Sequence, residues 1–470
     1  MQNSKLVRTM QVLSPEELKR LGKFLQSPFY NANPAIVKLY RLLRSGYPDF
    51  EAPKLTEEKV FKKLFPNRAY DHQKMLNLMS DFTALLEKYL VVLQLEAEET
   101  LQKKLLLRAY AKRPDCYAVF AKKLSVVEKH LDNQPYRNEH YYREKMELNL
   151  QFFSHPGTDM VKEGIGSLRH ALQYFEAYKS LAGAKLQCAR NDWSHAVGAR
   201  RSIDKVQENP ALANPVYVLY EKLDSLQREP AEKTTLLQLV RYFIDHAQVF
   251  DPDDKSNVLK ILLNHSNRLI NKGDLDSLQT SLELYKTGLA YDCFLVQGKM
   301  KESTFFNIVT AGTRCREFEW AEHFMQTYQG LLDARVRTDA LALAKGQWHL
   351  EKQEYLKATE FLQHSFAEPQ SIVKAKVLLV RSWCELYWED AGYLDLLLSQ
   401  LDAFDKHIWR NKAVAPRLLK GVRSFIGFTR KLALRKAEGK AMTELRSAIL
   451  QEPNVILKDW LLSKASQLKT

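Results

Sequence analysis

Residues 346–369 read GQWHLEKQEYLKATEFLQHSFAEP, and this stretch carries the pattern that decides the fold. Helical periodicity surrounds a short polar break, at which Glu354 is followed by Tyr355 and then by Ala358. An acid at this place stabilises the N-terminal end of the helix that follows the break. The aromatic ring can pack back on the preceding helix, and the small side chain of Ala358 lets the two backbones approach. The stretch therefore predicts two antiparallel helices joined by a turn.

The same signature recurs along the chain: an acid, an aromatic residue or leucine, and a small or apolar residue three positions later. Its aromatic or leucine position falls at 275, 318, 355 and 393, so successive copies are 43, 37 and 38 residues apart. One helix pair cannot bury its own apolar face, so we expect successive pairs to stack as a solenoid. The other copies are Asp192-Trp193-Ser-His-Ala196, Asp274-Leu275-Asp-Ser-Leu278, Glu317-Phe318-Glu-Trp-Ala321 and the degenerate Gly392-Tyr393-Leu-Asp-Leu396.

The copy at 346–369 resembles the tetratricopeptide-repeat family. Gly346, Tyr355 and Ala358 stand where that family places glycine, tyrosine and alanine, and Pro369 comes one position before the family's proline. The resemblance covers roughly residues 180–400, and it implies a superhelix of helix pairs without implying a ligand. The departures from the family pattern are repeat spacings longer than about 34 residues and the side chains of Lys345 and Ser365.

Over its whole length the chain also resembles a group of uncharacterised bacterial proteins of about this size. Those proteins combine an N-terminal helical unit with divergent helical repeats, so the resemblance implies this order of parts and no activity. It rests on short stretches spread from end to end: Leu25-Gln-Ser-Pro-Phe-Tyr-Asn31, Val60-Phe-Lys-Lys-Leu-Phe65, Leu78-Met-Ser-Asp-Phe82, Asn271-Lys-Gly273, Glu283-Leu-Tyr-Lys286, Thr304-Phe-Phe-Asn-Ile-Val309 and Arg410-Asn-Lys412.

Composition and pattern together predict an all-α protein. The 470 residues are 45% apolar and 27% charged, and only 17 glycines and 16 prolines are available for the turns that an all-β fold would need. We expect an N-terminal helical unit over residues 1–95, divergent tetratricopeptide-like repeats over 96–400 and a basic C-terminal helical cap over 401–470. Ser14 and Thr56 read as N-caps. The helices expected in the N-terminal unit span 15–26, 34–45, 57–64 and 71–93.

The excess of positive charge is local. The whole chain carries a net charge of +14, yet residues 406–440 alone hold 11 cations against the single acid Glu438, which gives 11 − 1 = +10. Wound as a helix over 414–437, this segment places six cations within an arc of roughly 140° and leaves most of the opposite side apolar. Leu434 is the one apolar residue on the charged side. The six candidate partner-binding residues are Arg417, Lys420, Arg423, Arg430, Lys431 and Arg435.

Such a row of cations has three interpretations. It is a solvated face that keeps the protein soluble, a surface for an acidic protein, or a surface for a nucleic acid or another phosphate-bearing partner. No aromatic stacking platform is recognisable beside the cations, which ranks the nucleic acid below a protein partner. Aromatic residues are expected to pack between adjacent helices. This expectation covers Trp193, Trp320, Trp348, Trp383, Trp388, Trp409 and Trp460.

Motifs that carry catalysis are missing from the sequence. It has no G-x-x-x-x-G-K-[ST] loop, no H-E-x-x-H pair, no G-x-S-x-G elbow and no ladder of cysteine and histidine ligands. We therefore expect no enzymatic activity, no cofactor and no metal. Five scattered cysteines, no secretory leader and no apolar run near the ~18 residues of a spanning helix predict a cytoplasmic chain without a membrane span.

The sequence thus predicts a non-catalytic scaffold whose stacked helix pairs bind a protein or peptide of unknown identity. The alternative is a nucleic-acid-associated protein that binds through the basic segment 406–440. Repeat architecture alone does not specify function, so both interpretations stay open at this point.

Overall fold

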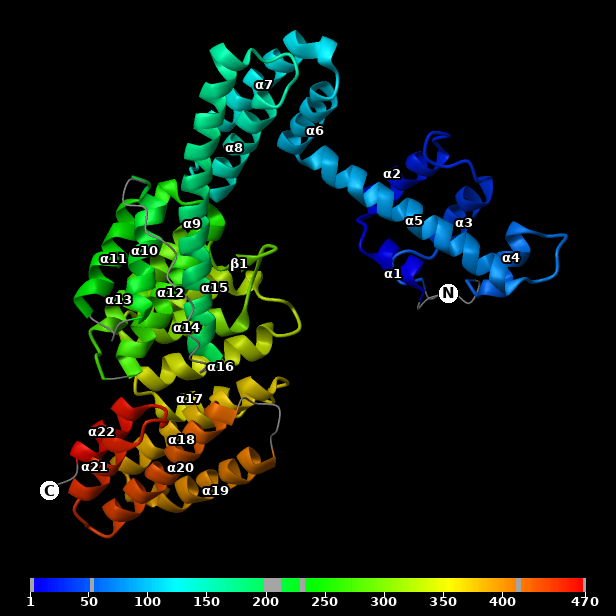
Figure 1. The fold of residues 1–470 in the computed structure, drawn as a ribbon. Helices are drawn as coiled ribbons and strands as arrows, with labels where there is room; N and C mark the ends of the chain where they lie inside the picture. The colour runs from blue at the N-terminus through cyan, green and yellow to red at the C-terminus, as the bar shows by residue number, and fades with distance from the viewer. Residues whose placement is uncertain are drawn as a thin grey trace. The chain divides into compact units, whose positions relative to one another are not determined.

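The structure is a computed structural model that describes residues 4–50, 55–197, 213–228, 233–271, 273–410 and 416–467. Regular structure in these ranges is almost entirely helical (Figure 1). The only strands within them, β1 (Leu295–Val296) and β2 (Lys299–Met300), form a short antiparallel hairpin. The predicted all-α class is confirmed.

The chain forms two compact units, and unit 1 comprises Met1–Asn133 and Glu147–Ala171. Leucine, phenylalanine and methionine side chains from its first five helices share one hydrophobic core. The helices that lie wholly within unit 1 are α1 (Lys5–Gln11), α2 (Pro15–Gln26), α3 (Pro34–Arg44), α4 (Glu57–Leu64), α5 (His72–Ala97), α6 (Glu99–Ala111) and α7 (Tyr117–Asp132).

The N-terminal helices follow their local signals closely. Ser14 and Glu17 form the expected capping box, in which each side chain accepts a hydrogen bond from the other's backbone N–H. Thr56 occupies the N-cap position of α4 but its side chain forms no capping hydrogen bond. Helices α2 to α5 therefore begin and end within a few residues of the predicted bounds, whereas α1 was not anticipated.

Unit 2 comprises Gln134–Met146 and Leu172–Thr470. One boundary between the units thus falls between α7 and α8 (Glu139–Phe153), and the other two fall within α8 and within α9 (Ile165–Val197). The sequence had placed its boundaries near residues 95 and 400 instead. The remaining helices are α10 (Pro215–Arg228), α11 (Lys233–Asp245), α12 (Pro252–Asn271), α13 (Ser277–Ala290), α14 (Glu302–Arg314), α15 (Phe318–Tyr328), α16 (Arg337–Glu351), α17 (Tyr355–Leu362), α18 (Pro369–Glu389), α19 (Leu394–Arg410), α20 (Pro416–Ala437), α21 (Thr443–Gln451) and α22 (Lys458–Ser466).

Helices of unit 2 pack in consecutive pairs. α12 packs against α13, α14 against α15, α16 against α17, and α18 against α19. The first helices of neighbouring pairs also contact each other, α14 with α16, α16 with α18, and α18 with α20. Stacked pairs require both kinds of contact, because each pair must cover the apolar face that its neighbour leaves open.

Small residues lie where the helices of a pair approach most closely. A Cβ atom built on Gly346 would lie 2.5 Å from Cδ2 of Leu362, so α16 and α17 meet at a separation that only glycine allows there. Gly312 plays the same role against the Trp320 ring, at 2.9 Å. Ala358 is fully buried. Ala358, the small residue of the recurring signature, thus lies at the predicted helix contact, and Gly346 and Gly312 add close contacts that the signature did not include.

The copy of the signature at 192–196 does not mark a turn. These residues lie inside α9, which continues to Val197. Asp192 directs its carboxylate to α12, where it pairs with Lys260 at 2.8 Å and accepts a hydrogen bond from Asn264 at 3.0 Å. The predicted helix start was wrong because this acid binds a neighbouring helix and no glycine or proline interrupts the backbone beside it.

A buried ionic cluster joins four helices of unit 2. The Lys185 ammonium of α9 lies 2.6 Å from Oδ1 of Asp254 on α12 and also pairs with Glu139 on α8. The hydroxyl of Tyr220 on α10 donates to Asp254 at 2.9 Å. Burial raises the pKa of Asp254 to about 6, although Lys185 opposes this shift, so the carboxylate is ionised at neutral pH.

We predict that Lys185→Met lowers the free energy of unfolding by about 3–5 kcal/mol at pH 8, because it leaves a buried carboxylate unpaired. Without the lysine, the pKa of Asp254 rises further, because Lys185 no longer opposes the effect of burial. The carboxyl group of the variant is therefore protonated and uncharged at pH 5, and the loss of stability should be smaller there than at pH 8. Urea unfolding at both pH values measures this difference.

Lys260→Met is the matched control, because Lys260 is 66% exposed in its pair with Asp192. It should cost about 1 kcal/mol or less at either pH. Equal losses in the two variants, or a loss for Lys185→Met that grows at pH 5, would contradict the assigned role of the cluster.

A second prediction concerns the close contact of α16 with α17. Gly346→Val should lower the free energy of unfolding by about 1–3 kcal/mol, because its side chain must displace Leu362. Gly427→Ala in α20 is the control, since its Cβ would meet no atom within 4 Å and should stabilise the helix by about 0.5–1 kcal/mol. Urea unfolding followed by circular dichroism measures both changes in the free energy of unfolding, which should have opposite signs. A Gly346→Val variant more stable than the parent would disprove the close contact.

Candidate functional site

Helix α20 is amphipathic, as the sequence predicted. It buries Val422, Phe425, Ile426 and Leu432 against the core that it shares with α18, α19 and the C-terminal helices. Leu434 is 39% exposed on the charged side, and Leu418 is equally exposed. The apolar stripe by which α20 packs on the core is therefore narrower than the sequence predicted. The charged side of the helix faces outward.

The basic face of α20 consists of the six cations predicted from the sequence: Arg417, Lys420, Arg423, Arg430, Lys431 and Arg435. Lys420, Arg423 and Lys431 are exposed, whereas Arg430 and Arg435 are half-buried. Arg417 lies in α20, but its side chain is outside the residues that the structure describes. Five of the six predicted side chains can thus be placed, and all five lie away from the buried stripe.

Neighbouring helices neutralise part of this face. Arg430 pairs with Asp402 of α19 at 2.6 Å. Arg435 pairs with Glu444 of α21 at 3.2 Å and donates to the backbone oxygen of Ala441 at 2.7 Å. Both acids lie just outside the window 406–440 from which the local charge was counted, so the sequence alone overstated the unpaired charge.

Lys436 belongs to the interior and not to the basic face. Its ammonium donates to the backbone oxygen of Tyr387 at 2.8 Å and lies 4.2 Å from the centre of the Tyr387 ring. Burial lowers the pKa of Lys436. Tyr387 is in the last turn of α18, where carbonyl groups lack helical partners and a cation is favourable. This lysine therefore caps α18.

Trp409 is a candidate site residue that sequence reasoning missed. It lies at the end of α19 and is 67% exposed, more than any other tryptophan whose side chain the structure describes. The guanidinium carbon of Arg423 lies 4.2 Å from the centre of its ring. The expected packing between helices is wrong for Trp409, whereas Trp383 and Trp460 are buried. The side chain of Trp193 lies outside the described residues.

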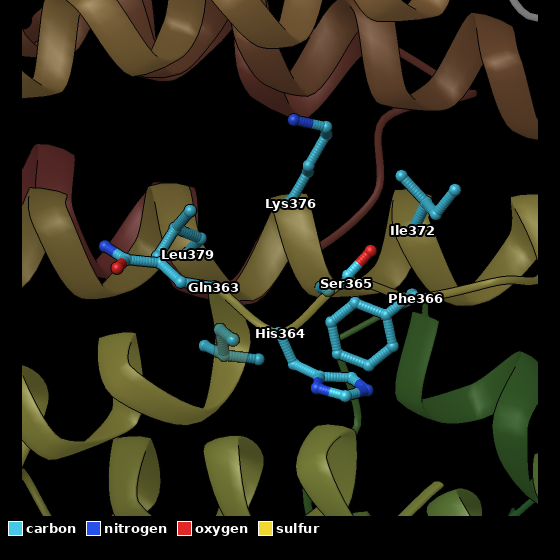
Figure 2. A pocket seen from close by; sticks show the side chains of 9 residues that line it. Gln363, His364, Ser365, Phe366, Ile372, Lys376 and Leu379 are labelled. Carbon is cyan, nitrogen blue, oxygen red and sulfur yellow. The ribbon is translucent and has the colours of Figure 1, made fainter. Parts of the chain in front are cut away.

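A cavity of about 360 Å³ opens where the turn after α17 meets α18 (Figure 2). Leu362, Ile372 and Leu379 supply apolar walls, and Lys376 points away from the rings of His364 and Phe366. His364 is held by Asp339, whose Oδ1 lies 2.9 Å from its Nε2. This mixture of apolar walls and one lysine suits an apolar side chain with an adjacent negative charge.

A second cavity, of about 370 Å³, lies beside the buried ionic cluster and is lined by Lys185, Cys188, Tyr220 and Lys260 among others. Cys188 is fully buried, and burial raises the pKa of its thiol, so it is a poor nucleophile. The ammonium of Lys185 is already paired with two carboxylates. Lys185 therefore joins helices of unit 2 by its ion pairs.

Within the described ranges no three histidine, cysteine or acidic side chains are grouped as metal ligands. In the same ranges no helix combines the length and hydropathy that crossing a bilayer requires.

We predict that the basic face is dispensable for folding. Arg430→Gln removes a pair whose side chains are 33% and 56% exposed, so it should change the free energy of unfolding by about 1 kcal/mol or less. Phe425→Ala, in the same helix but fully buried, should cost about 3–5 kcal/mol. Thermal and urea unfolding of both variants distinguish these roles. A loss for Arg430→Gln as large as that for Phe425→Ala would make this face structural.

No model of a known protein family, no curated protein and no solved structure matches the chain. The resemblances to tetratricopeptide repeats and to the bacterial helical-repeat group therefore remain predictions from the sequence.

Proposed function

We propose that the protein is a non-catalytic scaffold that binds a helical segment of another protein through the stacked helices of unit 2. The proposal includes the cytoplasmic location and the absence of a cofactor expected from the sequence. Its support comes from the way in which unit 2 holds one of its own helices.

The C-terminal helix α22 is bound by first helices of the predicted repeats. Its Trp460 is buried, and the indole N–H donates to Oε1 of Glu385 on α18 at 2.6 Å. Lys464 pairs with the same carboxylate, and Asp459 pairs with Arg314 at the end of α14. A buried aromatic anchor flanked by charged pairs is how grooves recognise amphipathic helices.

This internal contact is the observation that carries the proposal. The contact of α22 with α14 and α18 supports the view that the first helices of the pairs in unit 2 form apolar pockets surrounded by charged groups. The cavity between α17 and α18 combines the same elements, since Leu362 and Leu379 line it and Lys376 lies beside them. An incoming helix would place an apolar residue in this cavity and an acid near Lys376.

Crosslinking and mass spectrometry in the native cell, with and without nuclease, test this function. We expect a stoichiometric protein whose crosslinks fall on Lys345 or Lys376 and persist after nuclease treatment. Ser365→Trp, at the exposed rim of the cavity, should reduce this crosslinking several-fold by filling the cavity. Ser447→Trp, at an exposed site of α21, is the matched control and should leave it unchanged.

Two results would contradict the scaffold. One is the recovery of no protein crosslink that survives nuclease. The other is a partner whose crosslinks are equally reduced by both tryptophan substitutions, because that outcome would mean that the cavity does not receive it.

A further inference from the structure

We propose that the seam between α19 and α20 binds single-stranded nucleic acid, with a base stacked on Trp409 and phosphates contacted by the cations around it. This site uses different residues from the helix-binding surface and does not depend on it. The argument rests on an exposed aromatic ring, the register of the two helices and the distribution of charge.

The ring of Trp409 is available for stacking. An indole that is 67% exposed at a helix end leaves apolar surface in water that a base can cover. Arg423 lies over the ring at 4.2 Å, which presents a cation and a flat guanidinium at the same place. Bases stack both on aromatic rings and on guanidinium planes.

Two cross-helix contacts define the seam. Asp402 of α19 contacts Arg430 of α20, and Trp409 contacts Arg423, so the helices run antiparallel and these residues follow one line. Gly427 lies between Arg423 and Arg430, and the space above it is open. Because Gly427 has no side chain and no atom lies within 4 Å of the place of its Cβ, an extended strand can approach the backbone of α20 at this point.

Charge along the seam is positive. α20 carries no acid over Pro416–Ala437 and seven cations, of which all but Lys436 belong to the basic face. Lys406, Lys420 and Lys431 are exposed and form no ion pair among the described residues. On α19, Asp402 is neutralised by Arg430 and Asp405 is half-buried. At 1.5 Å per residue, Lys420 and Lys431 lie about 16 Å apart along the helix, enough for several phosphates.

The aromatic ring distinguishes this ligand from an acidic peptide and from a duplex. An acidic peptide would pair with the lysines but would leave the face of Trp409 without a matched partner. A duplex keeps its base faces stacked on one another, so it offers phosphates alone. Single-stranded RNA or DNA offers both a phosphate backbone and free base faces.

Fluorescence anisotropy of the intact protein with labelled single-stranded RNA and DNA of about 16 nucleotides tests the proposal. Four phosphate contacts, by Lys406, Lys420, Arg423 and Lys431, give a salt slope of about −0.7 × 4 = −2.8. Binding should therefore weaken about 50-fold between about 50 and 200 mM KCl. Unlabelled duplex and a polyglutamate peptide serve as competitors.

Variants separate stacking from charge. Trp409→Ala should weaken single-strand binding about 5- to 150-fold, Trp409→Phe should retain most of it, and the duplex should be little affected by either. Phe29→Ala, at an 85% exposed site of unit 1, is the aromatic control. Lys420→Gln with Lys431→Gln should reduce the salt slope, whereas the matched pair Lys19→Gln with Lys38→Gln, at exposed sites of unit 1, should not.

Unfolding midpoints equal to that of the parent are expected for the Trp409 variants, because the ring is exposed. The proposal is overturned if no salt-sensitive binding occurs, or if Trp409→Ala binds single strands as tightly as the parent. It is equally overturned if polyglutamate displaces the oligonucleotide as effectively as an unlabelled single strand, which would assign the seam to an acidic protein.

Discussion

The close approach of paired helices is the constraint on which unit 2 depends. At Gly346 the neighbouring leucine occupies the space that any side chain would need, and Gly312 faces Trp320 in the same way. These two pairs, α14 with α15 and α16 with α17, stand side by side, and their first helices contact each other. Those helices then present the cavity beside Lys376 and the contacts that hold Trp460.

The sequence predicted well what short-range chemistry decides. Three features depend on residues within a few positions of one another. They are the capping box at Ser14, the helix bounds of the N-terminal unit and the outward face of α20. Periodicity likewise identified the buried stripe through Phe425. The small residue of the recurring signature was expected at a helix contact, and Ala358 is fully buried there.

Contacts between residues far apart in the sequence could not be predicted from local patterns. Asp402 and Glu444 neutralise two arginines of α20, and no local count could assign them. The ionic cluster around Lys185 joins residues from four helices. Trp409 was expected in the core because tryptophan usually packs there, but it lies at the end of α19, is 67% exposed and contacts Arg423 of α20. The two proposed surfaces both arise from such tertiary placement.

A double-mutant cycle between Gly346→Val and Leu362→Ala tests the central constraint most directly. If the two helices are held at the distance that Gly346 and Leu362 set, the smaller alanine makes room for the valine. The double variant should then be more stable than the sum of the single losses, by about 1 kcal/mol or more of coupling energy. Strictly additive losses would mean that this contact does not control the approach of α16 and α17.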